Sequence, residues 1–320
     1  MKHVPIGDTG LAVTELCFGT SALGDMPDTY GYDVDEVRAF ATIDAIFDGP
    51  VNFLDTSRIY GFGRSEERIG KVIKRRGGLP EGFVLSTKLD RDFHTGRFDG
   101  DRVRKSFEES LSALGLDRIP MLHLHDPEYA ADISEITREG GAFDALFRLK
   151  EEWLVDAVGL AMGRLDLMFP LLRERPFDAL ISHNRFTLLN RAASEMFDYA
   201  HEKGIAILNA APYAGGVLAK GSAVMKKVTY QDAGEAELQP VRRVEEACSR
   251  LGVAPGAAAL QFSMKDPRVT STIVGVSKPE RVAETLEWAG AELPEALWQT
   301  LGDLPFATDD PEANRAYEPG

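Results

Sequence analysis

Four side chains that together could deliver a proton to a carbonyl group follow short apolar segments of the chain. Asp55, Lys88 and His125 each come within three residues of the end of such a segment, and Tyr60 lies five residues beyond Asp55. A tyrosine with a pKa of about 10 is a poor acid at neutral pH, but a nearby ammonium favours the phenolate and lowers that pKa. Lys88 could supply the ammonium, Asp55 could keep Lys88 protonated, and His125 could orient a substrate oxygen.

These four groups supply neither a reductant nor a nucleophile. They prepare a carbonyl for attack by something that the protein binds, so the set indicates a hydride-donating cofactor. Taken singly, each residue has a simpler explanation. An Asp or Lys at a strand end is more often a solvated or structural charge, and a His after an apolar strand is more often part of the core. His123, two residues before His125, could be such a packing residue.

The elements that would position these residues alternate regularly between strand and helix. We expect strands at 16–19, 51–54, 83–85, 121–124, 157–160, 177–181, 205–208 and 271–276. We expect helices at 35–47, 66–74, 100–114, 142–151, 165–173, 192–202, 241–251, 256–264 and 279–288. Parallel strands need such crossover connections, and eight units close into a (β/α)8 TIM barrel, an α/β fold whose catalytic groups lie at the carboxyl ends of the strands.

A doubly wound open sheet is the alternative fold, but its dinucleotide-binding fingerprint is missing. No G-x-G-x-x-G motif joins a strand to a helix, and the nearest approach, Gly61-Phe62-Gly63, has Glu66 where the third glycine belongs. We therefore expect residues 1–320 to form a single barrel domain. It would begin with a β-hairpin at 1–14, carry a mobile loop at 213–237, and end in a C-terminal helix and tail at 291–320.

The composition indicates which classes of binding partner and which cellular compartment we expect for the protein. The 320 residues are 44% hydrophobic and carry a formal net charge of −15, which argues against nucleic-acid binding but not against local binding of one small anion. Cys17 and Cys248 are too few for a disulfide framework or a multi-thiolate metal site. No targeting or membrane-spanning segment stands out, so we expect a cytoplasmic protein that is a monomer or a small homo-oligomer.

The order of four motifs resembles that of the aldo-keto reductases. These motifs are NFLDTSRIYG, SEERIG, LSTK and LHLHD, and the segments 184–191 and 210–221 resemble the branch of aldose and galactose dehydrogenases. The resemblance implies that Tyr60 is the general acid or base, that Asp55 and Lys88 tune it, and that His125 orients the carbonyl. It also implies an extended nicotinamide dinucleotide bound across the barrel mouth, and a small carbonyl or sugar substrate such as an aldehyde, a ketone or an aldose lactol.

The resemblance places three positions near the nicotinamide. Asn184 matches a residue that binds the carboxamide. Ala161-Met162 stands where the family usually has Ser-Asn, and Ala210 stands where many members have a ring-stacking tyrosine. Packing around the nicotinamide would therefore differ from the usual pattern.

The resemblance assigns the adenosine-phosphate end to residues 273–285. Ser277 and Arg281 would bind a 2′-phosphate, since arginine suits bidentate phosphate contacts. Glu284 matches an acid on the adenine side, and Thr285 stands where asparagine is commoner. Gly275 occupies the place of a phosphate-binding lysine in many members that prefer NADP. We expect NADP as cofactor, with NAD or dual use as the open alternative.

Substrate identity and two competing functions stay open at this point. The pocket walls would come from aromatic and histidine side chains, namely Tyr30, Tyr32, Phe93, His94, Tyr129, Tyr213 and Phe306. A nucleotide-binding regulatory subunit could use the same barrel, as the potassium-channel β subunits of the family do. A metal-dependent barrel hydrolase or lyase is the other alternative, although the close pair His123 and His125 share one strand.

Overall fold

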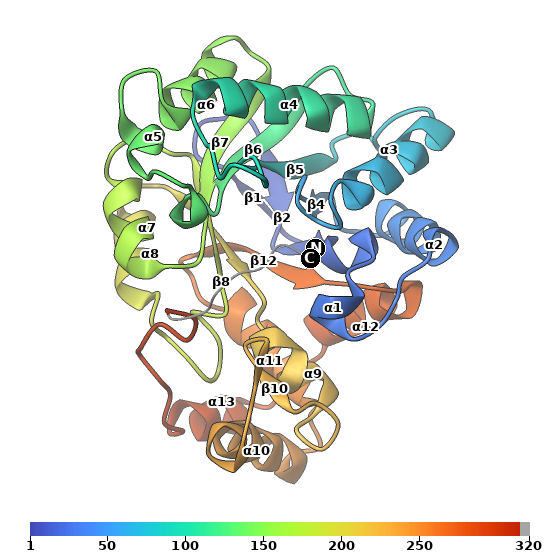
Figure 1. Cartoon of the computed structure of the whole chain (residues 1–320). Coiled ribbons are helices and arrows are strands. Elements are labelled where there is room, and N and C mark those ends of the chain that lie inside the picture. Colours follow the sequence, from blue (N-terminus) through green and yellow to red (C-terminus); the bar gives the residue numbers. More distant parts are fainter. Residues whose placement is uncertain (314–320) are drawn as a thin grey trace.

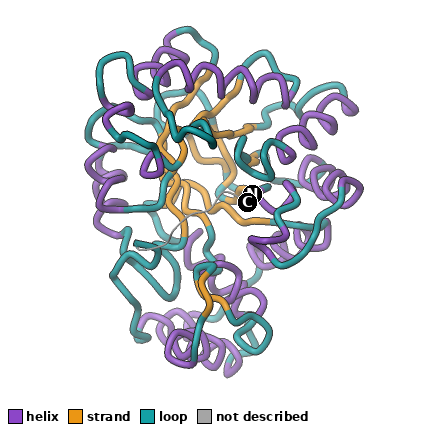
Figure 2. The backbone as a smooth tube through the Cα atoms, viewed as in Figure 1, coloured by secondary structure: helices purple, strands orange, loops and turns teal. Residues whose placement is uncertain are grey.

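Eight parallel strands close into a barrel at the centre of the molecule, and helices surround it (Figures 1 and 2). The computed structural model describes residues 1–313. The barrel strands are β3 (Leu16–Gly19), β4 (Phe53–Asp55), β5 (Val84–Leu89), β6 (Ile119–His125), β7 (Val155–Ala161), β8 (Ala179–His183), β9 (Ala206–Ala210) and β12 (Val269–Gly275). A two-stranded antiparallel hairpin, β1 (His3–Pro5) and β2 (Ala12–Thr14), precedes them. The predicted (β/α)8 barrel with its N-terminal hairpin is confirmed.

The long helices are α2 (Glu36–Phe47), α3 (Arg64–Arg76), α4 (Gly100–Leu114), α6 (Ala142–Glu151), α7 (Leu165–Leu172), α8 (Ser194–Glu202), α10 (Glu235–Arg250), α11 (Pro255–Met264), α12 (Pro279–Gly290) and α13 (Glu295–Gly302). Shorter helical turns are η1 (Ser21–Gly24), α1 (Pro27–Tyr30), η2 (Pro127–Tyr129), α5 (Ser134–Thr137), η3 (Ala214–Gly216) and α9 (Val217–Lys220). Among the described helices, none combines the length and the apolar character that a membrane crossing requires.

Local sequence explains why the helices begin and end where they do. The side chain of Asp35 accepts a hydrogen bond from the Arg38 backbone N–H and so caps α2, and Asp99 caps α4 by accepting from Arg102 N. Gly115, with φ of 66°, ends α4 in the left-handed conformation that glycine adopts without strain. These caps hold the helices whose apolar faces pack on the barrel.

The segment 213–237 differs from the predicted loop. It contains η3, α9 and a small hairpin of β10 (Lys227–Val228) and β11 (Gln231–Asp232), and α10 begins at Glu235 rather than at 241. The sequence pattern failed here because Pro240 lies inside α10, a position at which proline usually ends a helix. At the carboxyl terminus α13 agrees with the expected helix, and residues 314–320 of the predicted tail lie outside the described residues.

Two clusters of apolar side chains stabilise the fold. The larger joins the barrel strands to the surrounding helices, and the smaller lies among α9, α10, α11 and α13. Figure 1 shows α9, α10 and α13 gathered together below the barrel. The segment 213–237 is therefore anchored on its own apolar cluster at the edge of the barrel mouth.

Inside the barrel a histidine forms part of the packed floor below the mouth. His123 is fully buried; its Nδ1 lies 3.3 Å from Ser86 Oγ, and burial lowers the pKa of its ring well below the ordinary value. It lies against Gly159 of β7, where a Cβ would come within 2.4 Å of the His123 Cδ2 atom. His123 is therefore a neutral packing residue, and the absence of a side chain at position 159 makes room for it.

Substituting Gly159→Ala should destabilise the protein by about 1–3 kcal/mol, because the new methyl group would overpack a closed barrel. The same Cβ would lie 2.7 Å from the backbone oxygen of Ala179, which cannot rotate away. Urea unfolding measures the effect. Gly290→Ala, at the end of α12 with no atom within 4 Å of the new Cβ, is the control. Equal urea midpoints for the two variants would contradict this account of the barrel floor.

Candidate active site

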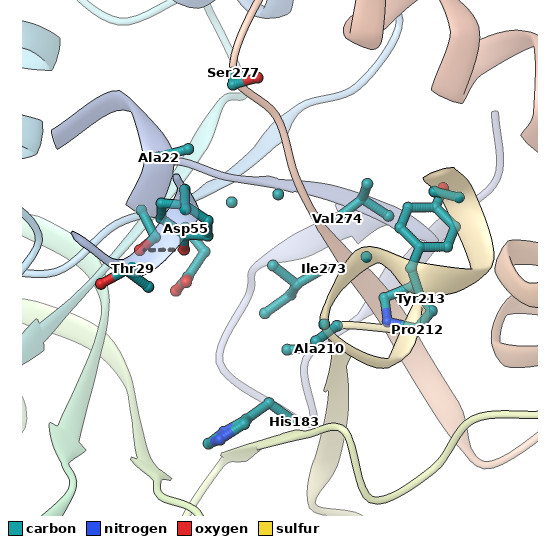
Figure 3. Close-up of a pocket in the computed structure, with 18 of the residues that line it drawn as sticks. Ala22, Thr29, Asp55, His183, Ala210, Pro212, Tyr213, Ile273, Val274 and Ser277 are labelled. Atoms are coloured by element: carbon teal, nitrogen blue, oxygen red, sulfur yellow. Dashed lines mark hydrogen bonds between the residues drawn. The ribbon is translucent and has the colours of Figure 1, made fainter. Parts of the chain in front are cut away.

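A pocket of about 690 Å³ opens at the carboxyl ends of the barrel strands. Figure 3 shows Ala22, Thr29 and Asp55 on one side of it, and Ala210, Pro212 and Tyr213 on the other. The side chains of Asp55, Tyr60, Lys88 and His125 all line this pocket. Parallel strands bring their carboxyl ends to one face, which is why residues so far apart in the sequence meet here.

Lys88 is at the centre of the catalytic end of the pocket. Its Nζ donates to Asp55 Oδ2 at 2.6 Å, to the Thr56 backbone oxygen at 2.6 Å and to Tyr60 Oη at 3.2 Å. The side chain is 2% exposed, so these oxygens replace the water around a buried ammonium. In the strand register Asp55 lies beside Ser86, two residues before Lys88, which places the acid and the lysine on the same inner face.

Tyr60 is a neutral phenol in this arrangement. Burial raises its pKa well above the ordinary value, and the negative charge of Asp55 raises it further. The sequence predicted the opposite direction, on the reasoning that Lys88 would favour the phenolate. The prediction failed because burial and Asp55 raise the pKa of this half-buried phenol, and the charge of Lys88 is already paired with Asp55. A protonated Tyr60 whose oxygen accepts from Lys88 is suited to donate its proton into the pocket.

His125 faces Tyr60 edge to face, with their ring centres 6.1 Å apart. Its Nδ1 lies 2.7 Å from Asp90 Oδ1 and 3.1 Å from Ser57 Oγ, while its Nε2 lies 3.6 Å from Asp126 Oδ2. Burial lowers the pKa of His125, but the two carboxylates outweigh burial and raise it above the ordinary value. Sequence analysis missed Asp90, although it follows Lys88 by two residues and so continues the inner face of β5.

The opposite end of the pocket is rich in cations. Arg38, Lys220, Lys278 and Arg281 line it together with Ser277. Arg38 Nε donates to the Ser277 backbone oxygen at 2.7 Å, and Arg281 forms an ion pair with Glu284. Burial and the charge of Arg281 lower the pKa of Lys220, as expected where like charges gather without an anion. Arg38 and Lys220 come from α2 and α9, outside the segment that sequence analysis identified.

The structure places five of the six predicted cofactor residues in the pocket wall. Gly275, Ser277, Arg281, Glu284 and Thr285 line it, and the space beside Gly275 is open. Asn184 is the exception. It is fully buried outside the pocket lining with φ of 60°, and His183 lines the pocket instead.

The structure does not bring Asn184 into the pocket wall, because β8 continues to His183 and its side chains alternate. Ile181 and His183 point into the pocket, and Asn184 turns away from it. Of the predicted substrate walls, Tyr30, Tyr32 and Tyr213 line the pocket, whereas Phe93, His94, Tyr129 and Phe306 do not. Ala161, Met162 and Ala210, which depart from the expected pattern, are also in the wall.

The carboxyl-terminal segment binds the rim of the pocket through a buried arginine. Arg185, which is 1% exposed, pairs with Asp310 at 2.8 Å and with Glu312 at 3.1 Å. Glu312 also accepts from Asn184 Nδ2 at 3.0 Å and lies 3.2 Å from His183 Nε2. Burial raises the pKa of Glu312, but His183, Asn184 and Arg185 together lower it far below the ordinary value. Asn184 therefore holds the chain terminus in place.

Comparison with known proteins agrees with this geometry. The sequence profile of the aldo/keto reductase family matches residues 15–304. The chain belongs to the aldo/keto reductase family. It is accordingly an oxidoreductase of that family.

Several curated members of the family are similar over most of their length. Pyridoxal 4-dehydrogenase of Microbacterium luteolum is 28% identical, over 92% of this chain and 95% of that protein. D-threo-aldose 1-dehydrogenase of a Pseudomonas species is 29% identical, over 92% and 94%. L-galactose dehydrogenase of Arabidopsis thaliana is 30% identical, over 88% and 86%. Similarity to the aldose and galactose dehydrogenases is thus confirmed.

A solved structure shares the fold. The holo form of an aldo-keto reductase from Bacillus halodurans superposes with a TM-score of 0.78, covering 98% of this chain and all of that one at 21% identity. The barrel, its hairpin and the following helices therefore follow the family fold along the whole chain.

Glu312→Gln should loosen residues 303–313 by about 1–3 kcal/mol at neutral pH, because the amide leaves His183 without this buried negative charge and Arg185 with Asp310 as its remaining carboxylate partner. Amide hydrogen exchange of this segment measures the change. The folded-state pKa of Glu312 is lowered, so its contribution is complete above the unfolded value, about pH 4.5, and is lost as the pH falls through the folded value. The difference between variant and wild type should therefore shrink below about pH 4.5.

Asp309→Asn is the control for this prediction, since Asp309 is an exposed carboxylate in the same segment. The role assigned to Glu312 is wrong if both variants exchange at the wild-type rate at pH 7.

Proposed function

We propose that the protein is an NAD(P)-dependent oxidoreductase that interconverts a carbonyl and an alcohol, or a lactone and a lactol. One observation carries the proposal. Lys88 Nζ contacts both Asp55 and Tyr60. The protonated phenol of Tyr60 faces the same pocket as His125, the pKa of which is raised. Family membership supports the same chemistry.

The residues have separate tasks in the reductive direction. Tyr60 Oη donates its proton to the substrate oxygen as negative charge develops there, and Lys88 stabilises the phenolate that remains. Asp55 and the Thr56 carbonyl keep Lys88 in place. His125 Nε2 faces the pocket and forms a second hydrogen bond to the substrate oxygen. In the oxidative direction the same groups act in reverse, with Tyr60 accepting the proton.

The residues at the two ends of the pocket fit a nicotinamide dinucleotide. A bound nicotinamide supplies or accepts the hydride. His183, Met162 and Ala210 would surround the nicotinamide ring, and Tyr213 stands three residues beyond Ala210 on the same wall (Figure 3). The phosphates would lie toward Lys220, Arg38 and Arg281.

The cationic end favours NADP over NAD in this proposal. Arg38 contacts Ser277 through both Nε and Nη2, at 2.7 Å to the backbone oxygen and 3.4 Å to Oγ, and Arg281 lies on the same wall. One guanidinium group beside this hydroxyl, with a second on the same wall, suits a terminal phosphate ester. Gly275 leaves open space where a lysine could have stood, and these arginines would compensate for it.

The substrate would be a small aldehyde, ketone or aldose lactol. Asp126 lines the pocket beside His125 Nε2, and its carboxylate can accept hydrogen bonds from substrate hydroxyl groups. The relatives act on pyridoxal, aldoses and L-galactose by name, and all three compounds carry hydroxyls near the reacting carbon. Residues 1–313 contain no group of three or more His, Cys, Asp or Glu side chains that could hold a metal ion.

Tyr60→Phe should reduce kcat by a factor of 100 or more, since proton transfer by a positioned side chain contributes about 10²–10⁴-fold. Nucleotide affinity should change less than about threefold, because the hydroxyl faces the substrate oxygen. Steady-state kinetics with an aldose and with an aromatic aldehyde, together with nucleotide titration, measure both quantities. Turnover at the wild-type rate would remove Tyr60 from the role of proton donor.

Arg281→Ala should weaken NADPH binding by about 10–100-fold and NADH binding by less than threefold, since a charged contact to phosphate contributes about 1.5–3 kcal/mol. Fluorescence titration of wild type and variant with each nucleotide measures the four affinities. Arg250→Ala is the control for net charge, because Arg250 is an exposed residue of α10 that pairs with Glu246. Equal losses for the two nucleotides would show that Arg281 does not bind the 2′-phosphate. Failure of wild type to bind either nucleotide would overturn the proposed function.

A further inference from the structure

A buried carboxylate lies behind His125, on the side away from the pocket. Asp90 is fully buried and does not line the pocket, so it is not placed to touch a substrate. Its Oδ1 lies 2.7 Å from His125 Nδ1, and its Oδ2 accepts from Ser57 Oγ at 3.0 Å and from the Ile59 backbone N–H at 2.9 Å. The two segments that follow β4 and β5 thus meet the end of β6 at one carboxyl group.

The hydrogen-bond directions determine which nitrogen of His125 carries the proton. Ser57 has one hydroxyl proton and donates it to Asp90, so it cannot also donate to Nδ1. An ionised carboxylate only accepts hydrogen bonds. Nδ1 must therefore carry the hydrogen of the Nδ1–Asp90 bond. In the neutral imidazole that leaves Nε2, which faces the pocket, as a bare acceptor.

We propose that Asp90 is a positioning residue that fixes His125 as the Nδ1–H tautomer. His125 then offers a substrate an acceptor when neutral and an Nε2–H donor only when it is an imidazolium. This inference rests on the proposed function, in which His125 Nε2 contacts the substrate oxygen. It adds that the imidazolium form of His125 donates a hydrogen bond from Nε2 to the substrate oxygen, and that the neutral form cannot donate it.

Charged and titratable groups on several elements face His125. Asp126 lies at Nε2, Asp90 at Nδ1, Lys88 and His123 lie on the barrel side, and Tyr60 packs against the ring. Burial lowers the pKa of His125, Asp126 and Asp90 raise it, and Lys88 lowers it, with a net rise. The reductive rate should therefore fall as the pH rises through this raised value, because the Nε2–H donor is lost.

The tautomer can be measured on the full chain without cofactor or turnover. Protein labelled with 15N in its six histidines, compared with a His125→Gln variant for assignment, gives the tautomer and the titration of His125 by long-range 1H–15N NMR. We expect neutral His125 to carry its hydrogen on Nδ1 and to titrate above the ordinary histidine value. An Nε2–H tautomer, or a titration at or below the ordinary value, would overturn the proposal whether or not any variant folds.

Asp90→Asn separates the charge from the shape of the side chain. Its oxygen can still accept from Ile59, while its amide group can donate to Nδ1 and so permit the other tautomer. The titration of His125 should fall by about one pH unit or more, since an opposite charge at this distance shifts a pKa by 1–3 units. An unchanged titration and tautomer in folded Asp90→Asn would overturn the proposal.

Two further variants serve as matched controls. Ser57→Ala removes a neutral neighbour of Nδ1 and should preserve both the tautomer and the raised pKa. Asp126→Asn removes a carboxylate from the Nε2 side, so it should lower the pKa while leaving the hydrogen on Nδ1. Loss of the Nδ1–H tautomer in Asp126→Asn would contradict the assignment to Asp90.

The pH dependence of turnover distinguishes an effect of Asp90 on the pKa of His125 from an effect on the fold alone. A purely structural role would leave the pH–rate profile unchanged. In Asp90→Asn the reductive rate should begin to fall at a pH lower by the same amount as the NMR titration. A uniform drop in kcat with an unmoved profile would show that Asp90 only supports the fold, which would overturn the proposal. Absence of turnover with every carbonyl tested would count against the proposed function, and the NMR result on His125 would still decide this inference.

Discussion

The buried ion pair between Lys88 and Asp55 is the interaction on which the site depends. Removing an ammonium and a carboxylate from water is costly, and their attraction repays the cost only when good hydrogen bonds complete both groups. Here Thr56 and Tyr60 complete the ammonium, and Ser86 donates to the second carboxylate oxygen at 3.0 Å. The pair joins β4 to β5, so it exists only when these strands are paired in register. The geometry of this site therefore depends on the register of β4 and β5.

Buried carboxylates also hold positively charged or imidazole side chains at other places around the barrel mouth. Asp90 follows β5 and binds His125 at the end of β6, and Glu312 of the chain terminus binds His183 and Arg185 at the end of β8. In each case a buried carboxylate on one segment holds a cation or an imidazole on another. Such pairs add little net stability compared with apolar packing, but breaking one leaves an uncompensated charge. They hold the polar side chains of the pocket in single orientations, which a catalytic site requires.

Sequence reasoning succeeded for residues whose position follows from the two-residue side-chain period of a strand and from the location of its carboxyl end. Asp55, Lys88 and His125 could be placed at one mouth because parallel strands end on one face and inner side chains recur every second residue. The same reasoning did not show that Asn184 lies outside the pocket wall, because β8 extends to His183. Asp90 follows the two-residue side-chain period of β5 but lies one residue beyond the end of that strand. Glu312 meets Asn184 across 128 residues of chain, which no local pattern reveals.

The charge distribution of the pocket is compatible with the proposed binding of an anionic cofactor by a chain with a net charge of −15. Arg38, Lys220, Lys278 and Arg281 gather at one end, while Asp55 and Asp126 lie at the other. A local field inside a cleft depends on the nearest charges, whereas the distant surface charges are screened by salt within about 10 Å. In the proposed function, an elongated ligand with phosphates at one end would enter in one orientation, because the reverse orientation would bring its phosphates against Asp126. Its uncharged end would then lie at Tyr60 and His125, so the proposed role of the cations includes selecting the reacting end of the ligand without contacting it.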